Sequence, residues 1–175
     1  MKTKLCVVTV VVLAVWGMKL YYANARADDL WWILTPTARL AGAITGTAFA
    51  TTPGEGYFSP ERLFLIEKSC AGINFMIAAF GMVTFALLHR VGSGLSGARV
   101  LAMSLLASYS ATALVNAARI AIAMRLAAHP VALSTLTPAL VHRVEGIVVY
   151  FGGLMLLYEV ARQFDRRAAL ARSGR

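Results

Sequence analysis

Charge is scarce in this chain: of its 175 residues, 14% are Asp, Glu, Lys or Arg, whereas 59% are hydrophobic. Ordinary soluble domains carry about 25% charged residues and do not need so much apolar sequence to build a core. The low charge therefore excludes an ordinary soluble domain and indicates an integral membrane protein. The length predicts a single domain.

Cysteine is scarce too, with Cys6 and Cys70 as the two residues of this type. Two thiols make no disulfide framework. Because Cys6 lies in an apolar run near the N-terminus, we expect both thiols to be free. The sequence also lacks a metal-ligand cluster, a glycine-rich phosphate loop and a serine-centred nucleophile motif. We therefore expect neither a metal nor a cofactor.

The N-terminal segment has the pattern of a targeting signal. A basic start at Met1–Lys4 precedes an apolar run over 5–18 and the small residues of 23–27. We interpret residues 1–22 as a retained signal anchor, because a lysine and two tyrosines make a poor approach to a cleavage site. A cleaved secretory signal is the alternative, and both place residue 24 outside the cytoplasm.

The segment 23–69 is predicted to be an extracytoplasmic loop. Its apolar stretch, 30–49, contains Arg39, and an arginine at the bilayer centre costs about 3 kcal/mol on insertion scales. We therefore expect 30–49 to form a helix in the outer interface instead of a membrane span. Residues 51–56 are rich in turn formers, and 57–66 are predicted to form a short hairpin.

Three later apolar stretches, 72–88, 100–126 and 140–160, are long enough for membrane helices. A glycine-rich loop at 91–97 and a polar loop at 134–138 separate them. Together with the N-terminal helix, they predict an all-α, polytopic membrane protein of about four transmembrane helices, with an outer-interface helix and a short extracytoplasmic hairpin. The predicted parts are a signal anchor (1–22), an extracytoplasmic loop (23–69), a transmembrane core (70–160) and a basic cytoplasmic tail (161–175).

The formal net charge of +9 follows the predicted topology. With the N-terminus inside, nine Lys and Arg residues face two acidic residues on the inner side, and eight face six on the outer side. This excess obeys the positive-inside rule and favours a multi-pass protein of the cytoplasmic membrane. The basic residues thus serve orientation in the lipid bilayer, and nucleic acid is not expected as a partner.

The same topology brings three polar residues from separate helices to the outer face. Cys70 opens a helix that runs inward, and His142 opens the last one. Arg119 lies 20 residues after Arg99, about 30 Å along a helix, which is the thickness of the hydrocarbon core. We therefore expect Cys70, Arg119 and His142 at one depth.

These residue types suit nucleophilic chemistry. Ser69 is expected to be the N-cap of the following helix, whose dipole would favour a thiolate at Cys70. The helix N-terminus near His142 would keep a neutral imidazole available as a base. The planar guanidinium of Arg119 suits an oxyanion or a carboxylate.

Two further residues are placed to support these groups. Asn116, one turn before Arg119, would orient it or donate a hydrogen bond, and Glu145, one turn after His142, would orient the imidazole. Structural interpretations stay open as well: Cys70 as a small apolar side chain, Arg119 as a snorkelling anchor and His142 as a solvated residue. Close helix packing is expected at the glycines at 72, 81, 146, 152 and 153.

Three short motifs resemble the exosortase/archaeosortase family. The motifs are Cys70-Ala71-Gly72 after Glu67, then Asn116-Ala-Ala-Arg119, then His142-Arg-Val-Glu-Gly146. The family pattern is Cys-x-Gly, Asn-x-x-Arg and His-x-x-x-Gly, in this order on successive membrane helices. The block 67–75 and the short chain are most similar to the exosortase K subgroup, although many relatives carry serine in place of Ala71.

This resemblance implies a membrane-embedded cysteine transpeptidase at the outer face of the cytoplasmic membrane, with 70–160 as its catalytic core. Cys70 would be the nucleophile, Arg119 the oxyanion and thiolate stabiliser, and His142 the general acid and base. Supporting positions would be Glu67, Gly72, Asn116 and Glu145. The substrates would be exported proteins whose C-terminal sorting signal has a short motif, a transmembrane helix and a basic cluster. A small transporter or accessory subunit, with Arg119 and His142 lining a polar path, is the alternative.

Overall fold

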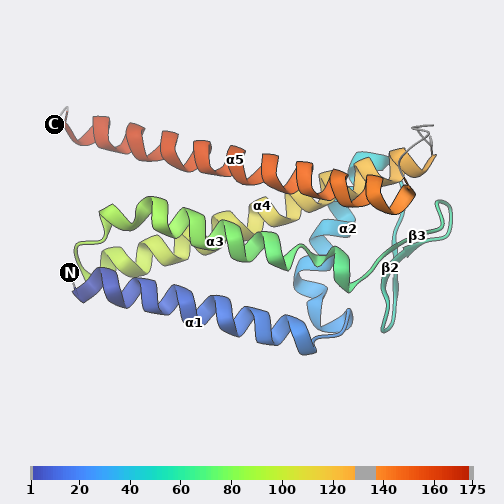
Figure 1. Cartoon of the computed structure of the whole chain (residues 1–175), viewed down its shortest axis with the longest axis horizontal. Helices are drawn as coiled ribbons and strands as arrows, with labels where there is room; N and C mark the ends of the chain where they lie inside the picture. The colour runs from blue at the N-terminus through green and yellow to red at the C-terminus, as the bar shows by residue number, and fades with distance from the viewer. Residues whose placement is uncertain (1, 129–136, 174–175) are drawn as a thin grey trace. The chain divides into compact units, whose positions relative to one another are not determined.

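The computed structural model describes residues 2–128 and 137–173 (Figure 1). Helices make up most of these residues, and the strands form one small sheet. Four segments of the described chain are long and apolar enough to cross a membrane: Lys2–Asn24, Lys68–Arg90, Gly94–Ala128 and Arg143–Arg167. The prediction of an all-α, polytopic membrane protein with four spanning helices is therefore confirmed.

The bounds of the long helices are α1 at Lys2–Asn24, α3 at Ile73–Leu87 with the 3-10 turn η3 at Leu88–Arg90, α4 at Gly94–Ala128 and α5 at Pro138–Ser173. The last two extend further than the sequence predicted, whereas α3 stays within its predicted range of 72–88. The predicted loop 91–97 is thus partly helical, and the basic segment from 161 continues α5 up to Ser173. The predicted polar loop at 134–138 lies largely outside the described residues.

The early start of α4 has a local cause in two serines. The backbone N–H of Ser93 donates to Oγ of Ser96 at 2.9 Å, and the N–H of Ser96 donates to Oγ of Ser93 at 3.3 Å. Such a reciprocal exchange satisfies N–H groups at a helix start that have no partner within the helix. Because 91–97 is rich in glycine, the sequence predicted a loop there, and this cap was not expected.

The helix predicted over 30–49 is observed as α2, Trp31–Thr45, after a short 3-10 helix η1, Asp28–Leu30. It ends before residue 49 because Gly46 takes a left-handed conformation, with φ of +68°, and the N–H of Thr47 bonds to the Gly42 carbonyl at 3.1 Å. Its 15 residues rise about 22 Å, less than the hydrocarbon thickness. α2 is therefore too short to span, as expected.

The predicted hairpin is part of a three-stranded antiparallel sheet. Its strands are β1 at Ala50–Thr52, β2 at Gly56–Ser59 and β3 at Phe64–Ile66, in the order β1-β2-β3. The assignment of 51–56 to a loop was wrong in its first half, since Thr51 pairs with Tyr57. Gly54 and Gly56 have the positive φ angles that a tight turn needs, so the turn is short. Thr51 and Thr52, before this turn, can therefore pair with β2.

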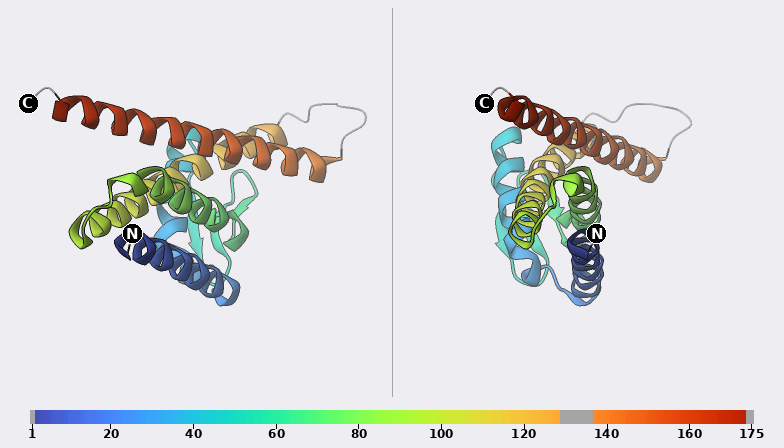
Figure 2. Two further views of the ribbon diagram at one scale, coloured as in Figure 1. Left: turned by 60° about the vertical axis from the view of Figure 1, so that its left-hand side comes forward. Right: turned by 90° about the vertical axis from the view of Figure 1, so that its left-hand side faces the viewer.

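The chain divides into two compact units. The first combines Met1–Ala23, Ile73–Ala111 and Gly153–Arg175, and the second combines Asn24–Gly72 and Thr112–Gly152. Within the first unit, α1, α3 and the α4 residues up to 111 lie side by side (Figures 1 and 2). Its core cluster consists of Val7, Val83, Leu87, Val91 and Val100.

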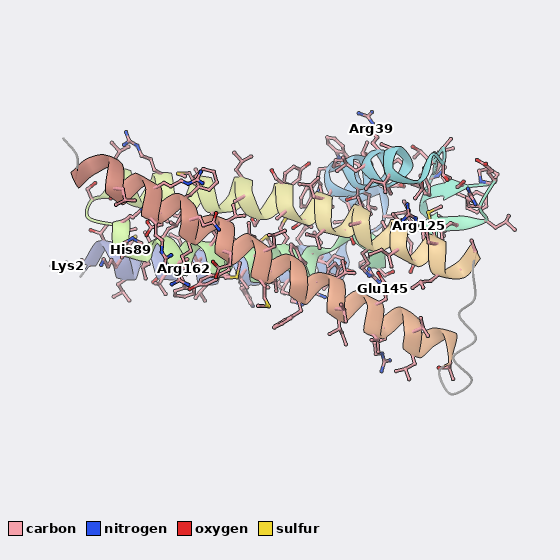
Figure 3. All side chains as sticks on the ribbon, turned by 90° about the horizontal axis from the view of Figure 1, so that it is seen from above. Lys2, Arg39, His89, Arg125, Glu145 and Arg162 are labelled. Atoms are coloured by element: carbon pink, nitrogen blue, oxygen red, sulfur yellow. The ribbon has the colours of Figure 1, made fainter. Side chains whose placement is uncertain are left out.

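One end of the first unit holds charged contacts between the turn after α3 and α5. His89 Nε2 lies 3.1 Å from Oδ1 of Asp165, and the guanidinium of Arg90 donates to both the carboxylate and the carbonyl of Asp165. In Figure 3, Lys2, His89 and Arg162 lie toward this same end. It is the end that the charge pattern assigns to the inner side.

In the second unit, α2 packs against strand β2 of the sheet. Leu30, Ile33 and Leu34 are fully buried. The hydroxyls of Thr35 and Tyr57 lie 2.5 Å apart and join α2 to β2, and the N–H of Gly54 bonds to the carboxylate of Asp28. These contacts fix the sheet, whose last strand leads directly to Cys70.

Candidate active site

Cys70 lies in a 3-10 turn, η2 at Lys68–Ala71, between β3 and α3. The Ser69 hydroxyl donates to Oε1 of Glu67 at 2.7 Å, and the N–H of Cys70 donates to the Glu67 carbonyl at 2.9 Å. Glu67 therefore holds the turn through its side chain and its backbone. The half-buried thiol lies 3.9 Å from Oγ of Ser69.

The prediction that Ser69 caps the following α-helix was wrong. Gly72, with φ of +68°, separates the turn from α3, which begins at Ile73. The Ser69 hydroxyl turns back to Glu67 instead of reaching the first amides of α3. Cys70 thus precedes α3 by three residues, and the dipole argument from that helix does not apply to its thiol.

The glycine of the Cys-x-Gly motif lets α4 approach the cysteine turn. A Cβ on Gly72 would lie 3.1 Å from Cγ2 of Thr112 and 3.3 Å from Cγ of Asn116. The Asn116 side chain is 1% exposed, and its Nδ2 donates to the carbonyl oxygen of Cys70. Asn116 therefore fixes the backbone of the candidate nucleophile.

Arg119 lies against α5. Its Nε is 3.9 Å from Oε2 of Glu145, and its Nη1 is 3.3 Å from the Tyr150 hydroxyl, with Cζ 5.2 Å from the centre of that ring. The Arg119 side chain is 14% exposed, which is too little for an anchor extended into water. A Cβ on Gly146 would lie 3.1 Å from Nε of Arg119, so the glycine of His-x-x-x-Gly makes room for the guanidinium.

Tyr150 is a site residue that the sequence reasoning missed. Its hydroxyl donates to Oδ1 of Asn116 at 2.8 Å and accepts from Arg119. A chain of hydrogen bonds therefore runs from Arg119 through Tyr150 and Asn116 to the Cys70 carbonyl. The available signal was the spacing of 142, 146 and 150, which places three positions on one face of a helix.

His142 lies near the start of α5, one turn before Glu145, and its side chain is outside the described residues. The structure places the Glu145 carboxylate beside Arg119. The expectation that Glu145 orients His142 falls on a side chain outside the described residues. Of the predicted site residues, the second unit thus brings together the Cys70 turn, Asn116, Arg119 and Glu145. The expected packing at Gly81 and Gly152 was wrong, since no described atom lies within 4 Å of an added Cβ.

A cavity of about 450 Å³ lies in the same unit, between the ends of α2 and α4 and the turn before β3. Its lining is mixed, with Ile44, Phe64 and Met124 as apolar residues and Arg62 and Arg125 as basic ones. Two of its lining residues are close to the site in sequence, since Phe64 comes six residues before Cys70 and Met124 five after Arg119.

These features define an all-α membrane protein with a polar cluster built around a cysteine turn. In the part of the chain that the structure describes, no group of three or more His, Cys, Asp and Glu residues could hold a metal ion. A scan against protein-family models and searches of curated proteins and of solved structures found no match to this chain.

Proposed function

We propose that this protein is a membrane-embedded cysteine transpeptidase that cleaves the C-terminal sorting signals of exported proteins, as its resemblance to the exosortase/archaeosortase family implies. The observation that carries the proposal is the hydrogen-bonded connection of the Cys70 turn to Asn116 and Arg119. These are residues of two of the three motifs. The backbone of the third motif lies on α5, with Gly146 against Arg119.

The reaction begins when Cys70, whose thiol proton passes to His142, attacks the scissile carbonyl as a thiolate and gives a tetrahedral oxyanion. Arg119 stabilises this oxyanion, and one such donor typically contributes about 3 kcal/mol. The low exposure of its side chain supports this role, because electrostatic interactions are stronger where water is excluded.

The intermediate then collapses to a thioester. The C–N bond breaks, and the amine leaves with a proton from His142 acting as general acid. His142 next takes a proton from the acceptor, which attacks the thioester carbonyl and releases the Cys70 sulfur. An amine acceptor gives transpeptidation, whereas water gives hydrolysis.

The substrate is an exported protein whose C-terminal signal has a short motif, an apolar span and a basic cluster. We place the site at the outer face of the cytoplasmic membrane, because the charge distribution puts the excess of basic residues at the inner ends. The segment next to the scissile bond would bind in the cavity lined by Phe64 and Met124, which lie close in sequence to Cys70 and Arg119.

The test is processing of such a reporter protein in cells that produce this chain. We expect Cys70→Ala to leave the reporter uncleaved although the variant stays in the membrane, and the matched control Cys6→Ala to process it normally. Cys6 is exposed and lies in α1, away from the motifs in sequence. Normal processing by Cys70→Ala would contradict the proposal, and a transporter would be indifferent to Cys70→Ser.

A further inference from the structure

The Tyr150 hydroxyl is the link between Arg119 and Asn116 in the site. A phenol has one O–H donor and can also accept, whereas a guanidinium has donors only. The contact with Arg119 at 3.3 Å therefore makes the Tyr150 oxygen the acceptor. Its own hydrogen is left for Oδ1 of Asn116, at 2.8 Å.

This direction also fixes the amide of Asn116. Because Oδ1 receives the Tyr150 hydrogen, Nδ2 faces the other way, toward the carbonyl of Cys70 to which it donates. The opposite amide orientation would set an NH₂ group against the hydroxyl and an oxygen against a carbonyl oxygen. The positive charge of Arg119 thus dictates, through one hydroxyl, how Asn116 holds the Cys70 turn.

The ring and the hydroxyl of Tyr150 have separable contacts. The ring lies under the guanidinium of Arg119, with 5.2 Å from Cζ to its centroid, and a phenylalanine would keep this contact. The hydrogen bond to Asn116, by contrast, is made by the hydroxyl.

We propose that Tyr150 is a positioning residue, whose hydroxyl sets the orientation of Asn116 and Arg119 around Cys70; its effect on catalysis rests on the proposed transpeptidase function. It does not itself touch the reacting atoms. Without the hydroxyl, the Asn116 amide loses the group that fixes its direction, and the guanidinium loses one of its acceptors.

The kinetic test is Tyr150→Phe, with Tyr158→Phe as the matched control on the same helix; Tyr158 is 42% exposed. We expect Tyr150→Phe to lower kcat for reporter cleavage about tenfold, the factor for one hydrogen bond to a charged group, with KM changed less than about twofold. In an Asn116→Leu background the same change should cost clearly less than in the parent chain, because the part of the effect that passes through Asn116 is already lost. Equal losses in both backgrounds, or an unchanged kcat, would overturn the inference.

A second readout needs no substrate. Hydrogen exchange of the peptide that covers 67–72 reports how firmly the Cys70 turn is held. We expect exchange to be about fivefold faster in Tyr150→Phe than in the parent chain, and unchanged in Tyr158→Phe. Faster exchange without any reporter cleavage by the parent would keep the positioning role and refute the transpeptidase, whereas unchanged exchange with normal cleavage would refute the positioning role alone.

Discussion

Gly146 and Arg119 approach each other so closely that a Cβ at position 146 would lie 3.1 Å from Nε of the arginine. The glycine is in α5 and the arginine in α4. Because Gly146 has no side chain, the guanidinium can lie beside Glu145 and Tyr150. This contact gives the glycine of the His-x-x-x-Gly motif a physical reason.

We expect Gly146→Ala to displace the Arg119 guanidinium and to lower reporter cleavage by about tenfold, since a small shift of a stabilising donor costs much of its effect. The matched control is Gly152→Ala, also in α5, where no described atom lies within 4 Å of the added carbon. Processing rates of the two variants, at equal amounts in the membrane, give the comparison. Equal rates in both would show that the close approach does not matter.

Replacing Gly72 is expected to act on stability as well as on activity. Its φ of +68° disfavours a side chain, and the added carbon would press on Thr112 and Asn116. We expect Gly72→Ala to lower the free energy of unfolding by about 1–3 kcal/mol, measured by thermal unfolding in detergent. Gly81→Ala serves as the control, because its added carbon meets no described atom and α3 already favours alanine.

Arg119→Lys is expected to lower reporter cleavage by about a hundredfold. A lysine keeps the charge but loses the planar fork that reaches Tyr150 and Glu145 at the same time. Arg39→Lys is the control, since this exposed side chain projects outward from α2 (Figure 3). Full activity of Arg119→Lys would mean that a positive charge alone stabilises the oxyanion. It would contradict the proposal that the planar guanidinium is needed.

The contacts of Asp165 are expected to stabilise the first unit without affecting chemistry. Asp165→Asn removes the charge that His89 and Arg90 share, and we expect it to lower the free energy of unfolding by about 1 kcal/mol. Glu159→Gln breaks a more exposed ion pair with Arg162, and we expect it to change the free energy of unfolding by less than about 0.5 kcal/mol. Thermal unfolding checks both, and loss of cleavage at unchanged stability would contradict this purely structural role.

Much of the fold was predictable because long apolar runs leave few alternatives in a membrane protein. The four spanning segments follow from hydropathy, and Arg39 within 30–49 indicated that this stretch does not span. The boundaries were less predictable, because local hydrogen bonds set them. The serine pair Ser93–Ser96 starts α4 inside a glycine-rich stretch, and Gly46 and Gly72 end or interrupt helices through positive φ angles.

The sequence indicated which residues lie near one another in the candidate site better than it indicated which side chains contact each other. Helix rise indicated that Arg119 lies at the depth of Cys70, and the spacing of Asn116 gave it the same face as Arg119. Two connections depend on tertiary contacts that spacing does not encode: Glu145 lies beside Arg119, and Tyr150 joins the arginine to Asn116. The cysteine turn was mistaken for a helix start because a serine before an apolar run is the usual pattern of an N-cap.

The central claim is that Cys70 becomes acylated by the substrate. The most direct measurement is mass spectrometry of the protein after acid quenching during turnover of an exported reporter, ideally with the acceptor withheld. The account predicts a peptide joined through a hydroxylamine-sensitive thioester to Cys70, and none on Cys6. A reporter that is processed while Cys70 stays unmodified and is replaceable by alanine would contradict it.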